Sequence, residues 1–286
     1  MSPIRPAVFA GRFYPSRKDE CLRMIEQMNR PVEVESFPVA GVVPHAGWIY
    51  SGSTAMLTYN ALRAAAPQTV VVFGAVHTLD RNDASLYPDG SWETPLGAVE
   101  IDAALAAELA TVDGVVADAD AHRGEHSIEV QLPLMLVALG DVRIVPISVR
   151  PGPRSAVIGR ACAERALRHR SDVVFVASTD LTHYGPNFAF EPAGHGPGGV
   201  RWAKEVNDRR FVQLIAEMNE QAIVPEAAVN HNACGSGAVA AAIAAAKVAG
   251  ATRYIELEHT TSAERDPLGG GPPTMSVGYE AGVFVR

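Results

Sequence analysis

The sequence predicts a three-layer α/β protein in which a central, mostly parallel or mixed sheet is flanked by helices. The first observation is a set of short runs rich in Val and Ile, which are typical of strands buried on both faces: Val39–Val43, Thr69–Ala75, Arg143–Val149, Asp172–Ser178 and Arg253–Glu258. The second is a set of helical stretches between these runs: Ser53–Ala66, Ala103–Thr111, Ile128–Leu139, Arg154–Arg168, Val200–Met218 and Gly237–Ala249. Strands and helices alternate for most of the chain, which is the pattern of a sheet covered by helices on both faces.

Two further segments indicate that the sheet is mixed. In Thr274–Arg286, apolar residues alternate with smaller or polar ones, which predicts an added antiparallel strand. Leu86–Ile101 is predicted to form a hairpin. Two Gly/Pro-rich segments, Pro192–Gly199 and Leu268–Pro273, are expected to be mobile loops over a site. Because no linker-like stretch divides the chain, we expect a single domain over residues 1–286.

Composition narrows the classes of partner. The net charge of −8 argues against nucleic acid and against anionic membrane surfaces, because both require a basic face. No stretch reaches the ~18 apolar residues of a membrane span, and the first residues lack the apolar core of a signal peptide. The cysteines Cys21, Cys162 and Cys234 form no CxxC pair, so a disulfide framework is not expected and a cytoplasmic location is favoured.

Two histidines follow buried strands in the same way. His45 comes directly after the strand Val39–Val43, and His77 follows the strand Thr69–Ala75. Loops at strand ends are where α/β proteins build their sites, so both side chains are candidates for one site at one edge of the sheet. Imidazole binds zinc, copper, iron and nickel alike. The alternative is that each is an ordinary loop histidine.

Asp180 and His183 lie just past the strand Asp172–Ser178. A carboxylate and an imidazole three residues apart in a tight loop can serve one site, with His183 as a general base that Asp180 orients. Alternatively, Asp180 binds the metal itself or supports a metal ligand from behind. A purely structural role for Asp180, as the N-cap of a short turn, remains open at this point.

Cys234 precedes Gly235-Ser236-Gly237 and an alanine-rich helix. Backbone N–H groups at the start of a helix favour a thiolate, which can bind a metal or attack an electrophile. The alternative is an inert buried cysteine, and this is the state expected for Cys21 and Cys162.

His126 lies in a segment that begins a helix, with Ser127 as a candidate N-cap and Glu129 in the first turn. Its side chain either donates a hydrogen bond into the site or is a solvated histidine of a capping segment. Pro133 is tolerated only if the regular helix begins near it or is kinked there. The other histidines have no comparable context, and a surface position is expected for His122, His169, His195, His231 and His259.

Taken in order, the motifs of the chain resemble those of the Memo family, also called AmmeMemoRadiSam system protein B. Each motif is weak alone, but the ordered set is specific and spans nearly the whole chain: Ala10-Gly11-Arg12-Phe13-Tyr14-Pro15, Pro44-His45-Ala46-Gly47 with Tyr50-Ser51-Gly52, Gly74-Ala75-Val76-His77, Trp92-Glu93-Thr94-Pro95-Leu96-Gly97, Glu125-His126-Ser127-Ile128-Glu129, Ser178-Thr179-Asp180 with His183, and Cys234-Gly235. That family is similar in fold to the class III extradiol dioxygenases, whose parent enzymes hold a non-heme iron.

The resemblance implies a role for each candidate residue. His45 and His77 match the two ligand histidines, and Cys234 stands where the dioxygenases have a ligand glutamate. His183 matches the catalytic base, with Asp180 beside it. His126 matches a further histidine of the pocket, which positions the substrate or stabilises bound oxygen.

The chain departs from the family pattern in one place. Relatives often carry two adjacent histidines in the second motif, whereas Thr78 follows His77 here. The thiolate that replaces the dioxygenase carboxylate also makes the ligand set softer, which shifts its preference toward copper or zinc.

Three functions are compatible with these residues. The first is a dioxygenase-like oxidoreductase in which His45, His77 and Cys234 hold Fe(II), with copper or zinc as alternatives, for reaction of O₂ with a small molecule. The second is a non-catalytic protein that binds a metal or a peptide in the same cleft. The third is a hydrolase or transferase with Cys234 as the nucleophile, His183 as the base and Asp180 as its orienting group. A small-molecule or peptide ligand is expected in each case, and a homo-oligomer is compatible with all of them.

Overall fold

A nine-stranded mixed sheet forms the centre of the molecule in the computed structural model, which describes residues 3–168, 170–266 and 272–286. Its strand order is β10-β12-β2-β9-β3-β8-β4-β7, and β11 also pairs with β12. These strands are β2 (Pro38–Val43), β3 (Thr69–Gly74), β4 (Ala84–Leu86), β7 (Val115–Ala117), β8 (Arg143–Val149), β9 (Val173–Ser178), β10 (His183–Tyr184), β11 (Arg253–Thr261) and β12 (Ser276–Val285).

The heart of this sheet is parallel. Strands β2, β9, β3 and β8 run side by side in the same direction, and their residues are almost all buried. Strand β12 pairs with β2 in the antiparallel direction, as the alternating C-terminal sequence predicted. Strand β4 is antiparallel to β8 on the other side. The predicted mixed sheet is therefore confirmed.

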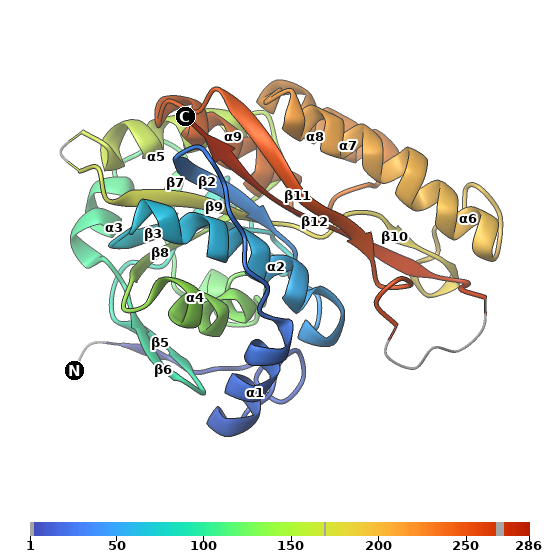
Figure 1. The fold of residues 1–286 in the computed structure, drawn as a ribbon. Helices are drawn as coiled ribbons and strands as arrows, with labels where there is room; N and C mark the ends of the chain where they lie inside the picture. The colour runs from blue at the N-terminus through green and yellow to red at the C-terminus, as the bar shows by residue number, and fades with distance from the viewer. Residues whose placement is uncertain (1–2, 169, 267–271) are drawn as a thin grey trace.

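Helices cover both faces of the sheet (Figure 1). On one face, helix α2 packs on β2 and β12 and contacts α1 and α4. On the other face, α9 packs on β2, β3, β8 and β9 and contacts α5 and α8. The helices are α1 (Lys18–Met28), α2 (Trp48–Leu62), α3 (Ala103–Leu109), α4 (Leu132–Leu139), α5 (Ser155–Ala166), α6 (Pro197–Trp202), α7 (Arg209–Ala216), α8 (Glu220–Asn230) and α9 (Ser236–Val248). The three-layer prediction holds.

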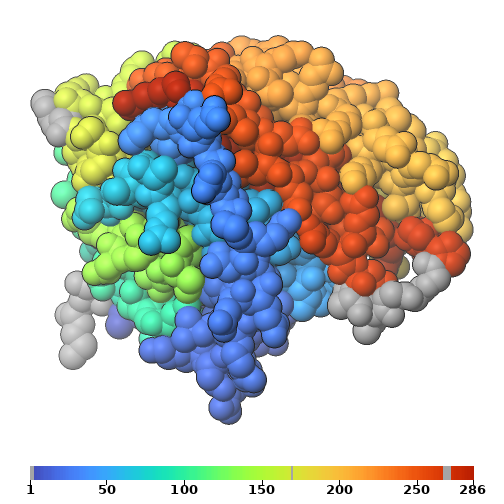
Figure 2. Space-filling model, in the orientation of Figure 1, coloured from blue at the N-terminus to red at the C-terminus, as the bar shows by residue number. Residues whose placement is uncertain are grey.

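A small second sheet closes one end of the molecule. The predicted hairpin consists of β5 (Ser91–Thr94) and β6 (Gly97–Glu100), and β1 (Ile4–Arg5) pairs with β5. Through β1, the N-terminal segment is tied to the body of the protein. In Figure 2 the blue N-terminal part of the chain lies on the surface beside the green surface of α4.

Several expectations need correction. Arg253–Glu258 is not a central strand, because it belongs to β11, which pairs with β12 and is largely half-exposed. The helices α1 and α8 were not predicted: α1 buries little apolar surface, and α8 contains Pro225. Of the two predicted loops, Pro192–Gly199 ends in the first turn of α6, and residues 268–271 lie outside the described residues.

The other helical predictions hold with local adjustments. Regular helix α4 begins at Leu132, so Pro133 stands in its first turn, where proline costs no hydrogen bond. The stretch Val200–Met218 is helical through α6 and α7, which are joined by the π-helix η5 (Ala203–Asp208). In the described part of the chain, no helix is long and apolar enough to cross a membrane.

Candidate metal centre

Three neighbouring parallel strands direct their carboxyl ends to one edge of the sheet. His45 follows β2, His77 follows β3, and Asp180 follows β9, which lies between them. Glycines let other segments approach this edge. A Cβ on Gly74 would lie 2.6 Å from the side chain of Ile128, and a Cβ on Gly235 would lie 2.4 Å from the carbonyl oxygen of Ser178.

His45 is held rigidly in a buried position, with 2% of its surface exposed. Its backbone N–H donates to Asp180 Oδ1 at 2.7 Å, and its ring Nδ1 lies 2.9 Å from Ser178 Oγ. The Ser178 hydroxyl donates its hydrogen to the carbonyl of Ser127, so it accepts from Nδ1–H of His45. The Nε2 lone pair of His45 therefore points away from this partner. Burial, reinforced by the neighbouring histidines, lowers the pKa of His45 well below its usual range.

Glu125 fixes His77 in the same way. One carboxylate oxygen accepts the backbone N–H of His77 at 2.7 Å, and the other lies 3.1 Å from its Nδ1. Burial lowers the pKa of His77, but interactions with Cys234 and Glu125 outweigh burial and raise it to about 10. For Glu125, burial is outweighed by the bonds that it accepts from His77 and its neighbours, and its pKa falls to about 2.

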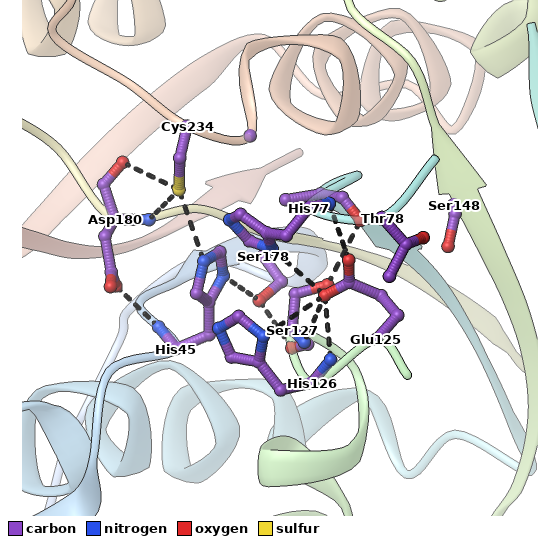
Figure 3. A network of polar contacts seen from close by, with 12 residues as sticks. His45, His77, Thr78, Glu125, His126, Ser127, Ser148, Ser178, Asp180 and Cys234 are labelled. Atoms are coloured by element: carbon purple, nitrogen blue, oxygen red, sulfur yellow. Dashed lines mark hydrogen bonds and ion pairs between the residues drawn. The ribbon is translucent and has the colours of Figure 1, made fainter. Parts of the chain in front are cut away.

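His126 completes a cluster of three imidazoles (Figure 3). One ring nitrogen from each of His45, His77 and His126 lies within 4.8 Å of the other two. The ring centroids are 5.2 Å apart for His45 and His77, and 4.6 Å apart for His77 and His126. Burial lowers the pKa of His126 to about 4, and the charge of the neighbouring His77 adds to this effect. The site opens toward solvent at His77, whose side chain is 32% exposed.

This donor set fits a metal ion. Imidazole nitrogen is a ligand for most transition metals. Metal-binding histidines typically donate their second ring N–H to a carboxylate, carbonyl or other acceptor, which fixes the ring and its tautomer. His77 has such a partner in Glu125, and His45 has one in Ser178.

Cys234 borders the cluster beside His45. Its Sγ lies 3.2 Å from Nε2 of His45 and accepts the backbone N–H of Asp180 at 3.3 Å. The loop before α9 is fixed by two further bonds, from the N–H of Cys234 to the carbonyl of Asp180 and from the N–H of Gly235 to Thr179 Oγ1. The thiol thus stands next to the nitrogen that would face a metal. As expected, Cys21 and Cys162 are buried, and burial raises the pKa of each to about 12.

Asp180 supports a candidate ligand, which was one of its expected roles, whereas the hydrogen-bond partner of His183 is a backbone carbonyl instead of Asp180. The Asp180 carboxylate supports the backbone of His45, and burial raises its pKa. His183 Nδ1 lies 3.0 Å from the carbonyl of Leu181, so Nδ1–H donates to that oxygen and Nε2 is left as an acceptor. The imidazoles that interact with the Cys234 thiol are those of His45, at 3.2 Å, and His77.

The remaining histidines divide into two groups. His195 and His231 are exposed, as predicted, and His169 lies outside the described residues. His122 and His259 are buried, which corrects the expectation of surface positions. His122, at the end of the short helix η2 (Asp120–His122), donates Nε2–H to the carbonyl of Ser85 in β4. His259 lies 3.2 Å from the Asp208 carboxylate.

Three supporting residues of the cluster, Glu125, Ser178 and Gln131, were missed in the sequence. Glu125 stands beside His126 in a quoted motif, and Ser178 ends a predicted strand, yet neither position showed a role. Gln131 also contributes, because its amide donates to the carbonyl of Pro44, just before His45. The available signal was adjacency to a candidate histidine, which does not reveal a side chain's direction.

A cavity of about 510 Å³ lies beside the His45 loop, because Ala46 and Tyr50 are part of its wall. Aromatic and apolar side chains line it together with polar ones such as Ser262 and Ser276. Its lining includes Ala46, Tyr50, Phe188, Met275, Val277 and Tyr279.

Thr78 stands where relatives often have a second histidine. Its hydroxyl lies 3.5 Å from the carbonyl of Ala121, and the side chain is half-buried. Nearby, Thr78 also lines a small surface cavity with the acidic side chains of Asp80 and Asp118. In Figure 3 it lies beside His77, on the Glu125 side of the cluster.

Comparison with known proteins agrees with these observations. The profile of the family described as "Memo-like protein" matches residues 5–283. A MEMO1 family protein of Thermococcus onnurineus is 40% identical over 91% of this chain and 94% of its own length. A MEMO1 family protein of Thermococcus kodakarensis is 37% identical over 99% of this chain and 100% of its own.

A crystal structure of an uncharacterized protein from Escherichia coli K12 shares the fold, with a TM-score of 0.50 and 16% identity over 84% of this chain and 99% of that one. The family profile spans every segment of the histidine cluster, and both relatives match more than nine-tenths of the chain. The chain belongs to the family of Memo-like proteins.

Proposed function

We propose that the protein binds one redox-active metal ion through His45, His77 and His126 and acts as a metal-dependent oxidoreductase on a small molecule. The observation that carries this proposal is the convergence of three imidazole nitrogens within 4.8 Å of one another. Iron(II) is the favoured metal, and copper is the alternative because the adjacent Cys234 is a soft ligand. When bound, such a metal supplies Lewis acidity and one-electron chemistry.

The protein's own residues prepare the site for this role. Ser178 and Glu125 accept the Nδ1–H groups of His45 and His77, which fixes both rings. His45, with its lowered pKa, offers an Nε2 lone pair, whereas His77, with its raised pKa, releases a proton when a metal binds. His183, with Nδ1–H bonded to the carbonyl of Leu181, accepts a substrate proton at Nε2. The cavity beside Ala46 and Tyr50 gives a small, largely apolar substrate a place next to the His45 loop.

Metal analysis and oxygen consumption test this proposal together. Protein loaded anaerobically with Fe(II) and desalted is expected to hold one iron per chain, and His45→Ala is expected to hold almost none. The loaded protein is expected to consume O₂ with at least one member of a panel of catechols and other small molecules. Stoichiometric iron without O₂ consumption on any of them would reject the oxidoreductase part and keep the metal site.

A non-catalytic metal-binding protein is the second candidate, and the position of Cys234 favours it. A thiol 3.2 Å from His45 Nε2 offers a soft donor, which suits Cu(I). Competition with a Cu(I) chelator measures this affinity. Tight binding in the wild type that is lost in Cys234→Ser, without turnover of any substrate, would support this candidate over an enzyme.

A further inference from the structure

The three imidazoles of the cluster are not held alike. His45 and His77 each have a hydrogen-bond partner at Nδ1 within 3.1 Å. His126 Nδ1 lies 3.5 Å from Glu125 Oε1, and its only hydrogen bond to that carboxylate comes from the backbone N–H. Within residues 3–168, 170–266 and 272–286, no hydrogen bond to either ring nitrogen orients the His126 side chain.

Aromatic rings take the place of that hydrogen bond. The ring centroid of His126 is 4.7 Å from that of Phe13 and 5.4 Å from that of Phe9, and both pairs are tilted. Phe9 and Phe13 also pack edge to face on each other, at 5.4 Å. Such tilted and edge-to-face arrangements are the favourable geometries for aromatic pairs. The ring centroid of His126 also lies 4.6 Å from that of His77.

The two phenylalanines lie on a segment that is itself firmly anchored. We call residues 3–16 the N-terminal strap. Its Arg5 forms a buried ion pair with Glu129 at 2.6 Å, and the two side chains are 3% and 0% exposed. The other carboxylate oxygen of Glu129 accepts the N–H of Phe9 at 2.7 Å and the hydroxyl of Tyr14 at 2.9 Å.

The anchors of the strap bracket both rings. Glu129 bonds directly to the backbone of Phe9, and the N–H of Trp48 donates to the carbonyl of Phe13 at 2.8 Å. Arg5 also donates to the carbonyl of Glu125, the residue that precedes His126, at 2.8 Å. The strap and the His126 segment therefore form one hydrogen-bonded unit. This unit keeps the rings of Phe9 and Phe13 packed against the imidazole of His126.

We propose that Phe9 and Phe13 are positioning residues for His126, and that ring packing from the N-terminal strap aims its imidazole into the metal site. This inference rests on the proposed metal site. Ring packing holds His126 less firmly than hydrogen bonds hold His45 and His77. His126 is therefore the ligand whose position responds most to substitutions in the strap.

Substitution of Phe13 tests this inference with Co(II) as the probe. Phe13→Leu keeps an apolar side chain of similar size but removes the ring face. We expect the Co(II) affinity to fall by at least about tenfold, the range that residues supporting metal ligands typically show. We also expect the visible absorption of bound Co(II) to change, because that spectrum reports the number and geometry of ligands. A loss of fold alone would not produce a bound Co(II) with an altered spectrum.

Two matched variants control the experiment. Phe37→Leu makes the same change at an exposed phenylalanine that packs on Arg286, and it is expected to bind Co(II) like the wild type. Phe13→Tyr keeps the ring and is expected to retain affinity and spectrum. If Phe13→Leu does not fold, Phe9→Leu makes the same test from the other ring.

The outcomes separate this inference from the proposed function. Wild-type Co(II) binding with an unchanged Phe13→Leu affinity and spectrum would overturn the role of the strap and leave the metal site intact. An equal loss in Phe13→Leu and Phe13→Tyr would also overturn it, because the ring would not be the determinant. A wild-type protein that binds no Co(II) and no Fe(II) would overturn both.

Discussion

At the scale of single residues, the cluster depends on side chains that never face the metal position. Glu125 is the clearest case, because its two oxygens accept the N–H groups of His77, His126 and Ser127 as well as Nδ1–H of His77. His45 and His77 were predicted from their positions after strands, and support of a metal ligand was one of the roles expected for Asp180. The supports from Glu125 and Ser178 were not predicted, because a sequence does not show which buried side chain turns toward which N–H.

We predict that Glu125→Gln weakens metal binding by about 10- to 100-fold, the usual effect of losing a residue that supports a metal ligand. The glutamine can accept at one atom only, and its NH₂ group faces N–H donors that now have no acceptor. Isothermal titration with Zn(II) or Co(II) measures the change. Glu100→Gln, at an exposed position on β6, is the control. Equal affinities in the two variants would show that Glu125 does not support the site.

At the scale of elements, the buried parallel strands and most helices follow from hydrophobic runs and periodicity. The assignment of Arg253–Glu258 failed because a Val- and Ile-rich pattern does not distinguish a central strand from an edge strand. Helix α8 was missed because Pro225 lies inside it, and tertiary packing overrides that local signal. The approach of the α9 loop to β9 was also not predictable, because it depends on the space that Gly235 leaves.

We predict that Gly235→Ala destabilises the protein by roughly 1–3 kcal/mol through overpacking, and also weakens metal binding. The new Cβ would lie 2.4 Å from the carbonyl of Ser178, so β9 and the Cys234 loop must separate. Urea denaturation measures the stability. Gly198→Ala, where nothing lies within 4 Å of the added Cβ, is the matched control, and its effect should be at most about 1 kcal/mol, in the stabilising direction. Similar losses in both would contradict this account.

At the scale of the whole molecule, the site exists only when the complete fold has formed. Its four residues come from separate segments: His45 and His77 follow β2 and β3, whereas His126 and Cys234 lie before α4 and α9. The sequence predicted that strand ends converge, since parallel neighbours share one edge. For His126 the residues alone left two alternatives, because its segment follows no central strand, and the family resemblance placed it in the pocket beside the ligands rather than among them. Stability of the fold and integrity of the site are thus coupled.

We predict that global stability falls below neutral pH, in part through His122. Burial lowers the pKa of this histidine to about 4, below the value of about 6.5 expected in the unfolded chain. Its contribution is therefore fully present above about pH 6.5 and is lost as the pH falls toward 4, by about 3 kcal/mol in total. Urea denaturation from pH 4 to 8 measures this loss.

The variant His122→Gln isolates that contribution. Its amide N–H can still donate to the carbonyl of Ser85, but it has no proton to gain in this range. We first subtract the difference in unfolding free energy between the two proteins at pH 8. After this subtraction, the variant should lose less stability than the wild type between pH 6.5 and 4. Parallel losses in the two proteins would exclude His122 as a source of the acid sensitivity.

Anomalous diffraction from crystals of the metal-loaded protein shows whether His45, His77 and His126 bind one metal ion. We expect a single strong peak about 2.0–2.1 Å from one ring nitrogen of each of the three histidines. The same map shows whether Cys234 Sγ is also within bonding distance, about 2.3 Å. A peak bonded elsewhere, or no peak at this cluster in crystals soaked with Zn(II) and with Fe(II), would contradict this expectation.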